Sequence, residues 1–254
     1  MKYKMIVTDL DRTLLRGDGS ISEYTVKILD RVRGNGIKLV FATARPIRNV
    51  KNVKARVCFD SCIYHNGAVV QFEKEIVFHK GIYNPINILQ NMLHGNPYMK
   101  IGVESCDTLY ANFDVNDIWP RTVYIHTKDF EECRNQITEK IIIPQKEIDE
   151  INIFEYMHEN LYLEVSEKKL AMILNKEASK VNGVRLVAEM YGISMEDVVA
   201  FGDDYNDIEI LKNCGLGVAV RNAYDDVKNY ADDICESNEN DGVAQYINEI
   251  ILDK

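Results

Sequence analysis

The sequence has no stretch of apolar residues that approaches the roughly 20 residues needed to cross a membrane. The apolar run that follows Lys2 and Lys4 is too short for the core of a signal peptide. Basic residues are also scarce: 30 lysines and arginines face 40 acidic residues, so the formal net charge is −10. This excess of negative charge argues against nonspecific binding to nucleic acid or to anionic membranes. We therefore expect a cytoplasmic protein that binds neither nucleic acid nor membrane.

Several cofactor-binding motifs are missing as well. The six cysteines form no paired C-x-x-C motif, which favours reduced thiols that pack in the interior over metal ligands or disulfides. The chain lacks the G-x-x-x-x-G-K-[ST] loop of nucleotide-binding proteins, and Gly215-Leu216-Gly217 lacks the third glycine of a dinucleotide-binding motif. The sequence therefore does not predict a protein that binds ATP or NAD.

The first 15 residues do contain a short apolar run that ends in two aspartates. Residues 3–8 have the length and composition of a buried strand, and Gly17-Asp18-Gly19-Ser20 predicts a turn soon after it. Asp9 and Asp11 lie at the carboxyl end of this strand, where open α/β sheets bind their ligands. Because buried carboxylates need a cation or hydrogen-bond donors, the pair favours a divalent metal site.

Two other interpretations apply to the same aspartates. An isolated Asp-x-Asp sequence is often a pair of loop carboxylates that cap the next element. In a calcium loop, Asp9, Asp11 and Thr13 would occupy the first, third and fifth ligand positions. That loop requires glycine at its sixth position and a bidentate glutamate at its twelfth, where this chain has Leu14 and Ser20. The calcium loop is thus excluded. The rest of the chain decides between a divalent metal site and a pair of capping carboxylates.

Strand and helix patterns alternate after the first strand. Ser22 is a typical N-cap for a helix that ends near Gly34. Residues 37–42 then predict a second buried strand, which ends at Thr43. Short connections from strand to helix to strand are typical of a parallel, doubly wound sheet.

The pattern changes after about residue 84, where helical periodicity alternates with many short strand patterns. The helical segments lie near residues 85–95 and 129–140, and the strand segments lie near residues 99–104, 107–112, 121–126, 150–156, 160–166 and 170–174. So many short strands per helix favour a separate antiparallel α+β domain.

The parallel pattern resumes near Lys180, which begins a predicted helix that ends at Gly192. Residues 197–201 then predict a strand that ends in Gly202-Asp203-Asp204-Tyr205-Asn206-Asp207. We therefore predict an α/β fold, in which a doubly wound, Rossmann-like parallel sheet core is interrupted by an inserted α+β domain. The predicted core comprises residues 1–82 and 178–254, and the inserted domain comprises residues 83–177.

Polar side chains follow three strands of the predicted core. Asp9 and Asp11 follow the first strand, Thr43 follows the second, and Asp203 follows the strand at residues 197–201. Because the carboxyl ends of parallel strands meet at one edge of a sheet, we expect these side chains to lie together. Lys180, at the start of its helix, completes the constellation.

In these motifs the chain resembles the haloacid dehalogenase-like (HAD) superfamily, and within it the Cof-type phosphatases with a C2 (type IIB) cap. The segments that carry the resemblance are Asp9-Leu10-Asp11-Arg12-Thr13-Leu14-Leu15, Thr43, Lys180 and Gly202-Asp203-Asp204-Tyr205-Asn206-Asp207, together with Asn66-Gly67-Ala68, Ala219-Val220-Arg221-Asn222-Ala223 and Asp241-Gly242-Val243-Ala244. The family usually has glycine where Arg12 stands and often glycine where Ala44 stands. The backbone must therefore accept a side chain at both positions.

The resemblance implies a magnesium-dependent phosphatase that hydrolyses a small phosphorylated metabolite, such as a sugar phosphate, through an aspartyl-phosphate. Asp9 is the implied nucleophile and Asp11 the implied general acid and base. The implied Mg²⁺ ligands are the Asp9 carboxylate, the Asp11 backbone carbonyl and the Asp203 carboxylate. The implied phosphate-binding residues are Thr43, Ala44, Lys180 and Asn206, and Asp207 is a supporting residue.

Two alternatives share these motifs: a phosphomutase of the same fold, and a non-catalytic protein that binds a phosphorylated ligand. The resemblance also implies that the inserted domain closes over the substrate, and we expect a monomer or a weak homodimer. Aromatic and polar residues of the inserted domain are candidates for the substrate pocket, although each is also a candidate for core or surface: Tyr98, Tyr110, Asn112, Trp119 and Tyr124.

Overall fold

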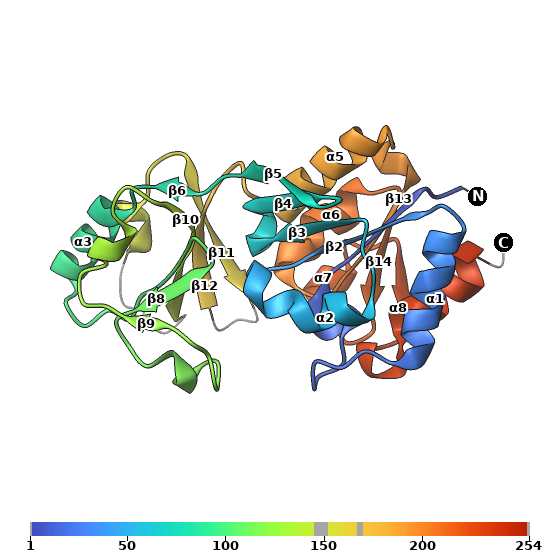
Figure 1. Cartoon of the computed structure of the whole chain (residues 1–254), viewed down its shortest axis with the longest axis horizontal. Coiled ribbons are helices and arrows are strands. Elements are labelled where there is room, and N and C mark those ends of the chain that lie inside the picture. Colours follow the sequence, from blue (N-terminus) through green and yellow to red (C-terminus); the bar gives the residue numbers. More distant parts are fainter. Residues whose placement is uncertain (1, 145–151, 167–169, 253–254) are drawn as a thin grey trace. The chain divides into compact units, whose positions relative to one another are not determined.

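The computed structural model describes residues 2–144, 152–166 and 170–252, which form two compact units (Figure 1). The first unit comprises Met1–Phe78 and Ser179–Lys254, and the second comprises His79–Ala178. These boundaries differ by four residues and by one residue from the predicted junctions after residues 82 and 177. Ile82 belongs to the second unit because it pairs with Thr138 in the sheet of that unit.

Eight strands form one sheet in the described part of the first unit, in the order β15-β14-β13-β1-β2-β3-β4-β5. Their bounds are β1 Met5–Thr8, β2 Lys38–Ala42, β3 Ser61–Tyr64, β4 Val69–Phe72, β5 Glu75–His79, β13 Val198–Gly202, β14 Leu216–Val220 and β15 Asp233–Cys235. The six strands from β15 to β3 are parallel to one another, and β4 pairs antiparallel with β3. The predicted parallel sheet is thus confirmed.

The central strand β1 is buried along its whole length because both of its faces contribute to a hydrophobic core. Ile6 packs in one core, and Met5 and Val7 pack in the other. A strand that is buried on both faces needs apolar residues at every position, which explains the continuous apolar run in the sequence.

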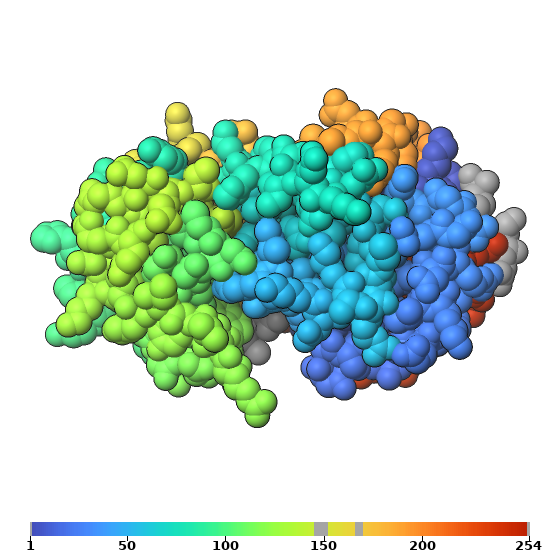
Figure 2. Space-filling view, in the orientation of Figure 1, coloured from blue at the N-terminus to red at the C-terminus, as the bar shows by residue number. Residues whose placement is uncertain are grey.

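Helices of the first unit contribute to both cores, as a doubly wound fold requires. One core contains side chains of α1 (Glu23–Gly34), α2 (Lys51–Arg56) and α8 (Gly242–Tyr246), and the other contains side chains of α5 (Lys180–Tyr191), α6 (Ile208–Asn213) and α7 (Asp225–Lys228). Figure 2 shows residues of α5, in orange, beside the teal residues of the first segment of the chain, which lie far from α5 in the sequence. None of the described helices has both the length and the apolar character needed to cross a membrane.

The ends of two helices in the first unit agree with the signals in the sequence. Ser22 precedes α1, and its hydroxyl accepts a hydrogen bond from the Thr25 amide at 3.0 Å. Gly192 ends α5 with a φ angle of 66°, a left-handed conformation that costs glycine little. These local signals place the start of α1 and the end of α5.

The second unit contains a largely antiparallel sheet with a helix on one face, which confirms its α+β character. In its described part, the sheet order is β11-β12-β10-β7-β8-β9, and β6 also pairs with β10. The bounds are β6 Ile82–Tyr83, β7 Gly102–Ser105, β8 Thr108–Ala111, β9 Ile125–His126, β10 Ile137–Pro144, β11 Leu161–Ser166 and β12 Leu170–Asn175. The helix α3 (Ile86–Gly95) packs its apolar side chains into a core with Ile101, Ile141 and Ile173.

Three predictions outside the site are wrong. Residues 129–140 are not a helix, because β10 begins at Ile137 and its side chains alternate between two cores, with Ile141 in one and Ile142 in the other. Residues 153–156 form a single 3₁₀ turn rather than a strand, and residues 150 and 151 lie outside the described residues. The thiols of Cys58 and Cys106 are exposed rather than packed in the interior.

Candidate active site

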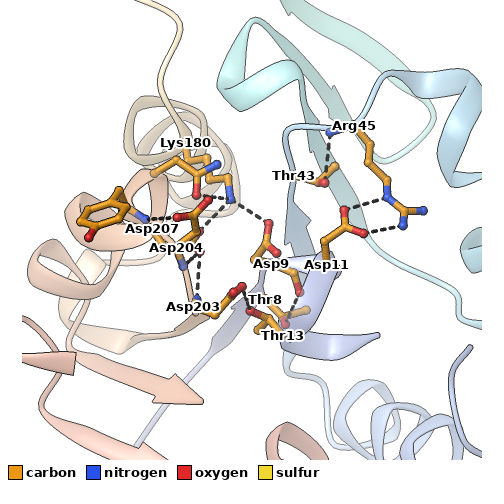
Figure 3. Close-up of polar contacts among 12 residues, drawn as sticks. Thr8, Asp9, Asp11, Thr13, Thr43, Arg45, Lys180, Asp203, Asp204 and Asp207 are labelled. Carbon is orange, nitrogen blue, oxygen red and sulfur yellow. Dashed lines mark hydrogen bonds and ion pairs between the residues drawn. The ribbon is translucent and has the colours of Figure 1, made fainter. Parts of the chain in front are cut away.

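Three of the predicted polar segments meet at the carboxyl edge of the sheet in the first unit (Figure 3). Asp9 follows β1, Thr43 follows β2 and Asp203 follows β13. The register places these strand ends at the same height, because Thr8 pairs with both Phe41 and Phe201. The Asp9 amide also donates a hydrogen bond to the Phe201 carbonyl at 3.0 Å, so regular sheet pairing continues to the site.

Lys180 is the centre of a buried charge cluster at this edge (Figure 3). Its ammonium lies 2.7 Å from Oδ1 of Asp9 and 2.7 Å from Oδ1 of Asp207, and it also donates to Oδ1 of Asn206 at 3.3 Å. The Lys180 side chain is only 2% exposed. One ammonium therefore partners two buried carboxylates.

Burial and mutual repulsion dominate the electrostatics of this cluster. Burial raises the pKa of Asp9 well above its ordinary value, Lys180 lowers it, and the nearby carboxylates raise it again. Burial, with help from the Asp207 charge, raises the pKa of Asp203 to about 7. Burial alone lowers the pKa of Lys180, but Asp207 and Asp9 outweigh it and the net shift is upward. The three carboxylates outnumber the buried ammonium, so the cluster favours a further cation.

Asp203 and Asp207 have different surroundings despite their proximity. Both oxygens of Asp207 are engaged, since Oδ1 accepts from Lys180 while Oδ2 accepts from the amides of Asp203 and Asp204 at 3.1 and 3.2 Å. Asp203 accepts a hydrogen bond from the Thr13 hydroxyl at 2.7 Å through Oδ1. Its Oδ2 lies 3.8 Å from Nε of Arg12.

The buried carboxylates fit a metal ion that prefers oxygen ligands. Asp9, Asp203 and Asp207 each offer an oxygen, and these oxygens lie within 4.8 Å of one another. Oxygen-only sites of this kind suit Mg²⁺, which uses few carboxylates and keeps several waters. Because Asp207 is already committed to Lys180 and to two amides, Asp9 and Asp203 are the better pair of ligands.

The side chain of Asp11 points away from this cluster (Figure 3). It is 45% exposed, and its two oxygens accept hydrogen bonds from Nε and Nη2 of Arg45 at 2.8 and 2.5 Å. Arg12, the next residue, has a φ angle of 57°, a left-handed conformation that glycine adopts at less cost than other residues. The Arg12 carbonyl accepts a hydrogen bond from the Asn222 side chain at 2.7 Å, which supports the strained turn.

The remaining predicted residues surround the same strand ends. Thr43 is fully buried, and its hydroxyl accepts a hydrogen bond from the Arg45 amide at 3.2 Å. Ala44 lies between them in the same turn. Asn206 accepts a hydrogen bond from Lys180, so it contacts the lysine ammonium rather than a group of its own strand end. The assignment of Thr43, Ala44 and Asn206 to phosphate binding stays a prediction.

Sequence reasoning missed two contacts at the site. Thr13 belongs to the first motif, but the sequence does not predict that its hydroxyl donates a hydrogen bond to Asp203. No motif in the sequence analysis includes Arg45, yet its guanidinium donates hydrogen bonds to both oxygens of Asp11. The one signal in the sequence was a basic residue two positions after Thr43, at an edge where most charges are acidic.

In the second unit, the candidate pocket residues divide by their contacts. Asn112 bonds the backbone of Ile101 and Met99, both at 2.8 Å, so its amide stabilises the fold. Trp119 is half-buried against two small hydrophobic clusters, and Tyr98 is exposed. The structure thus favours a structural role for Asn112.

Comparisons with known proteins agree with this arrangement. The family model described as haloacid dehalogenase-like hydrolase matches residues 6–247. The chain is 27% identical over 259 residues to a putative phosphatase of Haemophilus influenzae, with 98% of each sequence covered. It is also 27% identical over 266 residues to the 5-amino-6-(5-phospho-D-ribitylamino)uracil phosphatase YitU of Bacillus subtilis, with 98% of this chain and 97% of YitU covered.

Solved structures show the same fold. The HAD subclass IIB sugar phosphatase BT4131 is 24% identical, with a TM-score of 0.84 over 96% of this chain and 98% of that one. A haloacid dehalogenase-like hydrolase from Bacteroides thetaiotaomicron is also 24% identical, with a TM-score of 0.85 over 98% of this chain and 100% of that one. Because the family model spans nearly the whole sequence, the chain belongs to the haloacid dehalogenase-like hydrolase family.

Proposed function

We propose that the protein is a magnesium-dependent phosphatase that hydrolyses a small phosphorylated metabolite, such as a sugar phosphate, through an aspartyl-phosphate on Asp9. The observation that carries this proposal is the buried contact of 2.7 Å between the Lys180 ammonium and Asp9, with the Asp203 carboxylate in the same cluster. Two relatives named as phosphatases support the reaction class, and one of them is named for a small phosphorylated compound.

In the first step, an oxygen of Asp9 forms a bond to the substrate phosphorus. The bond between phosphorus and the ester oxygen breaks, and its electron pair stays on the leaving oxygen. Asp11 donates a proton to that oxygen, which releases an alcohol. Lys180, already at hydrogen-bond distance from Asp9, stabilises the negative charge of the transferred group.

In the second step, water attacks the phosphorus of the aspartyl-phosphate. Asp11, now ionised, accepts a proton from the water, and the bond between phosphorus and Asp9 breaks. Inorganic phosphate leaves, and the carboxylate of Asp9 is restored. Thr43 and the Ala44 amide bind phosphate oxygens through both steps, since a hydroxyl that accepts one hydrogen bond can still donate another.

The carboxylates of Asp9 and Asp203 and the backbone carbonyl of Asp11 would hold the Mg²⁺. A bound divalent cation offsets the repulsion between the Asp9 carboxylate and the substrate phosphate. Asp207 and Asn206 orient Lys180 toward Asp9, because both accept hydrogen bonds from its ammonium.

The experiment is a screen of the purified protein against phosphate esters, with and without Mg²⁺, beside two variants. Asp9→Asn should lose at least about 1,000-fold in turnover of every ester, because it removes the nucleophile. Asp18→Asn changes an exposed carboxylate in the neighbouring turn and should retain the wild-type rate.

Retained turnover in Asp9→Asn would contradict the nucleophile. Isomerisation of a sugar phosphate that depends on an added bisphosphate, without net release of inorganic phosphate, would favour a phosphomutase. Tight binding of a phosphorylated ligand without Mg²⁺-dependent hydrolysis would favour a ligand-binding protein.

A further inference from the structure

We propose that Arg45 is a positioning residue that fixes the Asp11 carboxyl group for proton transfer to the leaving group. This inference rests on the proposed function, because it concerns the general acid of that reaction. Arg45 lies outside the motif residues Asp9, Asp11, Thr43, Lys180 and Asp203. The described hydrogen bonds of its side chain go to the Asp11 carboxylate and to the Asn49 carbonyl, so Asp11 is the catalytic residue that it contacts.

The contact has the geometry of a two-point clamp. Nε of Arg45 donates to Oδ2 of Asp11 at 2.8 Å, and Nη2 donates to Oδ1 at 2.5 Å (Figure 3). A guanidinium that binds both oxygens fixes the plane of a carboxylate as well as its position, which a lysine ammonium cannot do. The clamp uses one lone pair of each Asp11 oxygen and leaves the other for the transferred proton, so it sets the direction in which Asp11 presents that proton.

Arg45 is itself held in place, which distinguishes the clamp from an ordinary surface ion pair. Its Nη1 donates to the Asn49 carbonyl at 3.2 Å. Its backbone amide donates to the Thr43 hydroxyl at 3.2 Å, and its carbonyl accepts from the His65 amide at 3.1 Å. Both the head group and the backbone of Arg45 are thus tied to segments that follow β2 and β3.

The Asp11 carboxyl group needs such a partner because the surrounding protein does not bury and immobilise it. Its side chain is 45% exposed, whereas Asp9 and Asp203 are buried. A half-exposed aspartate would otherwise exchange among rotamers, and a proton donor that is misplaced by about 1 Å can cost roughly 100-fold in rate. Each of the two aspartates thus has its own cation: Lys180 for Asp9, and Arg45 for Asp11.

Esters with different leaving groups distinguish a defect in proton donation from general damage to the site, because general damage lowers kcat/KM for both esters alike. A phenyl ester with a nitro group releases an anion that is stable without a proton, whereas an alkyl ester releases an alkoxide that requires one. Because kcat/KM reports the steps up to the first transfer, a defect in proton donation lowers kcat/KM for the alkyl ester selectively.

The experiment measures kcat/KM of the full-length, Mg²⁺-loaded protein for p-nitrophenyl phosphate and for the best alkyl phosphate of the substrate screen. Arg45→Met should lower kcat/KM roughly 10- to 100-fold for the alkyl ester and less than about threefold for the aryl ester. Arg45→Lys keeps the positive charge but cannot bind both oxygens of Asp11 in one plane. It should show an intermediate loss of kcat/KM with the same selectivity for the alkyl ester. If Arg45→Met does not fold, the selectivity of Arg45→Lys decides the question.

Three controls separate the possible outcomes. Asp11→Asn should show the same selectivity with a larger loss, and the Asp11→Asn/Arg45→Met double variant should be no worse than Asp11→Asn alone, because both changes remove one function. Arg33→Met removes a partly exposed ion pair with Asp60, which precedes β3 and so lies at the opposite edge of the sheet. This variant should leave kcat/KM unchanged for both esters.

Equal losses of kcat/KM for the two esters in the Arg45 variants would overturn the positioning role while the proposed function stands. A double variant whose loss of kcat/KM exceeds that of Asp11→Asn would do the same. An Asp11→Asn variant without selectivity would overturn the general acid itself, and the inference with it.

Discussion

At the scale of single residues, the site depends on one buried ammonium. Lys180 hydrogen-bonds to both Asp9 and Asp207, each at 2.7 Å, and the described structure buries all three side chains. The sequence identified these residues through their motifs. It did not predict Thr13 on Asp203 or Arg45 on Asp11, because those contacts join side chains of separate turns and leave no periodic pattern.

The first prediction concerns the stability of the metal-free protein. Lys180→Met should lower the free energy of unfolding by about 3–5 kcal/mol, because it leaves two buried carboxylates without their partner. Lys4→Met is the matched control: Lys4 also lies 2.7 Å from an aspartate, Asp197, but its side chain is 60% exposed. That change should cost less than about 1 kcal/mol. Urea denaturation checks both variants, and equal losses would show that Lys180 does not compensate the buried charge.

At the scale of elements, the strands and the turns after them bring the site together. The positions of β1, β2, β13, α1 and α5 follow from apolar runs and from the caps Ser22 of α1 and Gly192 of α5. The prediction failed at residues 129–140, where β10 carries a register shift between Thr138 and Lys140 that interrupts simple alternation. A strand whose two faces are both buried also lacks the polar alternation that distinguishes it from a helix.

The second prediction concerns the turn after β3. Gly67 has a φ angle of 99°, and a Cβ there would lie 2.1 Å from the carbonyl oxygen of Ser179, the N-cap of α5. Gly67→Ala should therefore displace the start of α5, which carries Lys180, and should lower both stability and kcat.

The control is Gly36→Ala, because Gly36 has a similarly positive φ angle of 77° but open space around it. That change should cost roughly 1 kcal/mol in stability and leave kcat unchanged. Thermal unfolding and steady-state assays compare the two variants. Equal effects on kcat would contradict a close contact that controls the position of Lys180.

At the scale of the whole molecule, the order of the motifs along the chain made the fold of the first unit predictable. The second unit interrupts the first between Phe78 and Ser179, so residues about 170 positions apart in the sequence must meet for the site to form. Formation of the site is therefore coupled to folding of the first unit, and a metal bound there should stabilise the folded state.

The third prediction follows from this coupling. Saturating Mg²⁺ should raise the Tm of the wild-type protein, by the equivalent of about 2.7 kcal/mol at 100 times the Kd. Asp203→Asn should lose most of this effect because it removes a proposed ligand, whereas Asp18→Asn should retain it. Thermal scans across a Mg²⁺ titration measure the shift. An unchanged shift in Asp203→Asn would exclude Asp203 as a ligand.

The central claim is that Asp9 accepts the phosphoryl group, and chemical trapping tests it most directly. The Asp11→Asn variant, which should still transfer a phosphoryl group from p-nitrophenyl phosphate but hydrolyse the intermediate slowly, is mixed with this ester and quenched with borohydride. Borohydride reduces an aspartyl-phosphate to homoserine, so peptide mass spectrometry should find homoserine at position 9. Release of p-nitrophenol with an unmodified Asp9, or with the modification at another residue, would contradict the account.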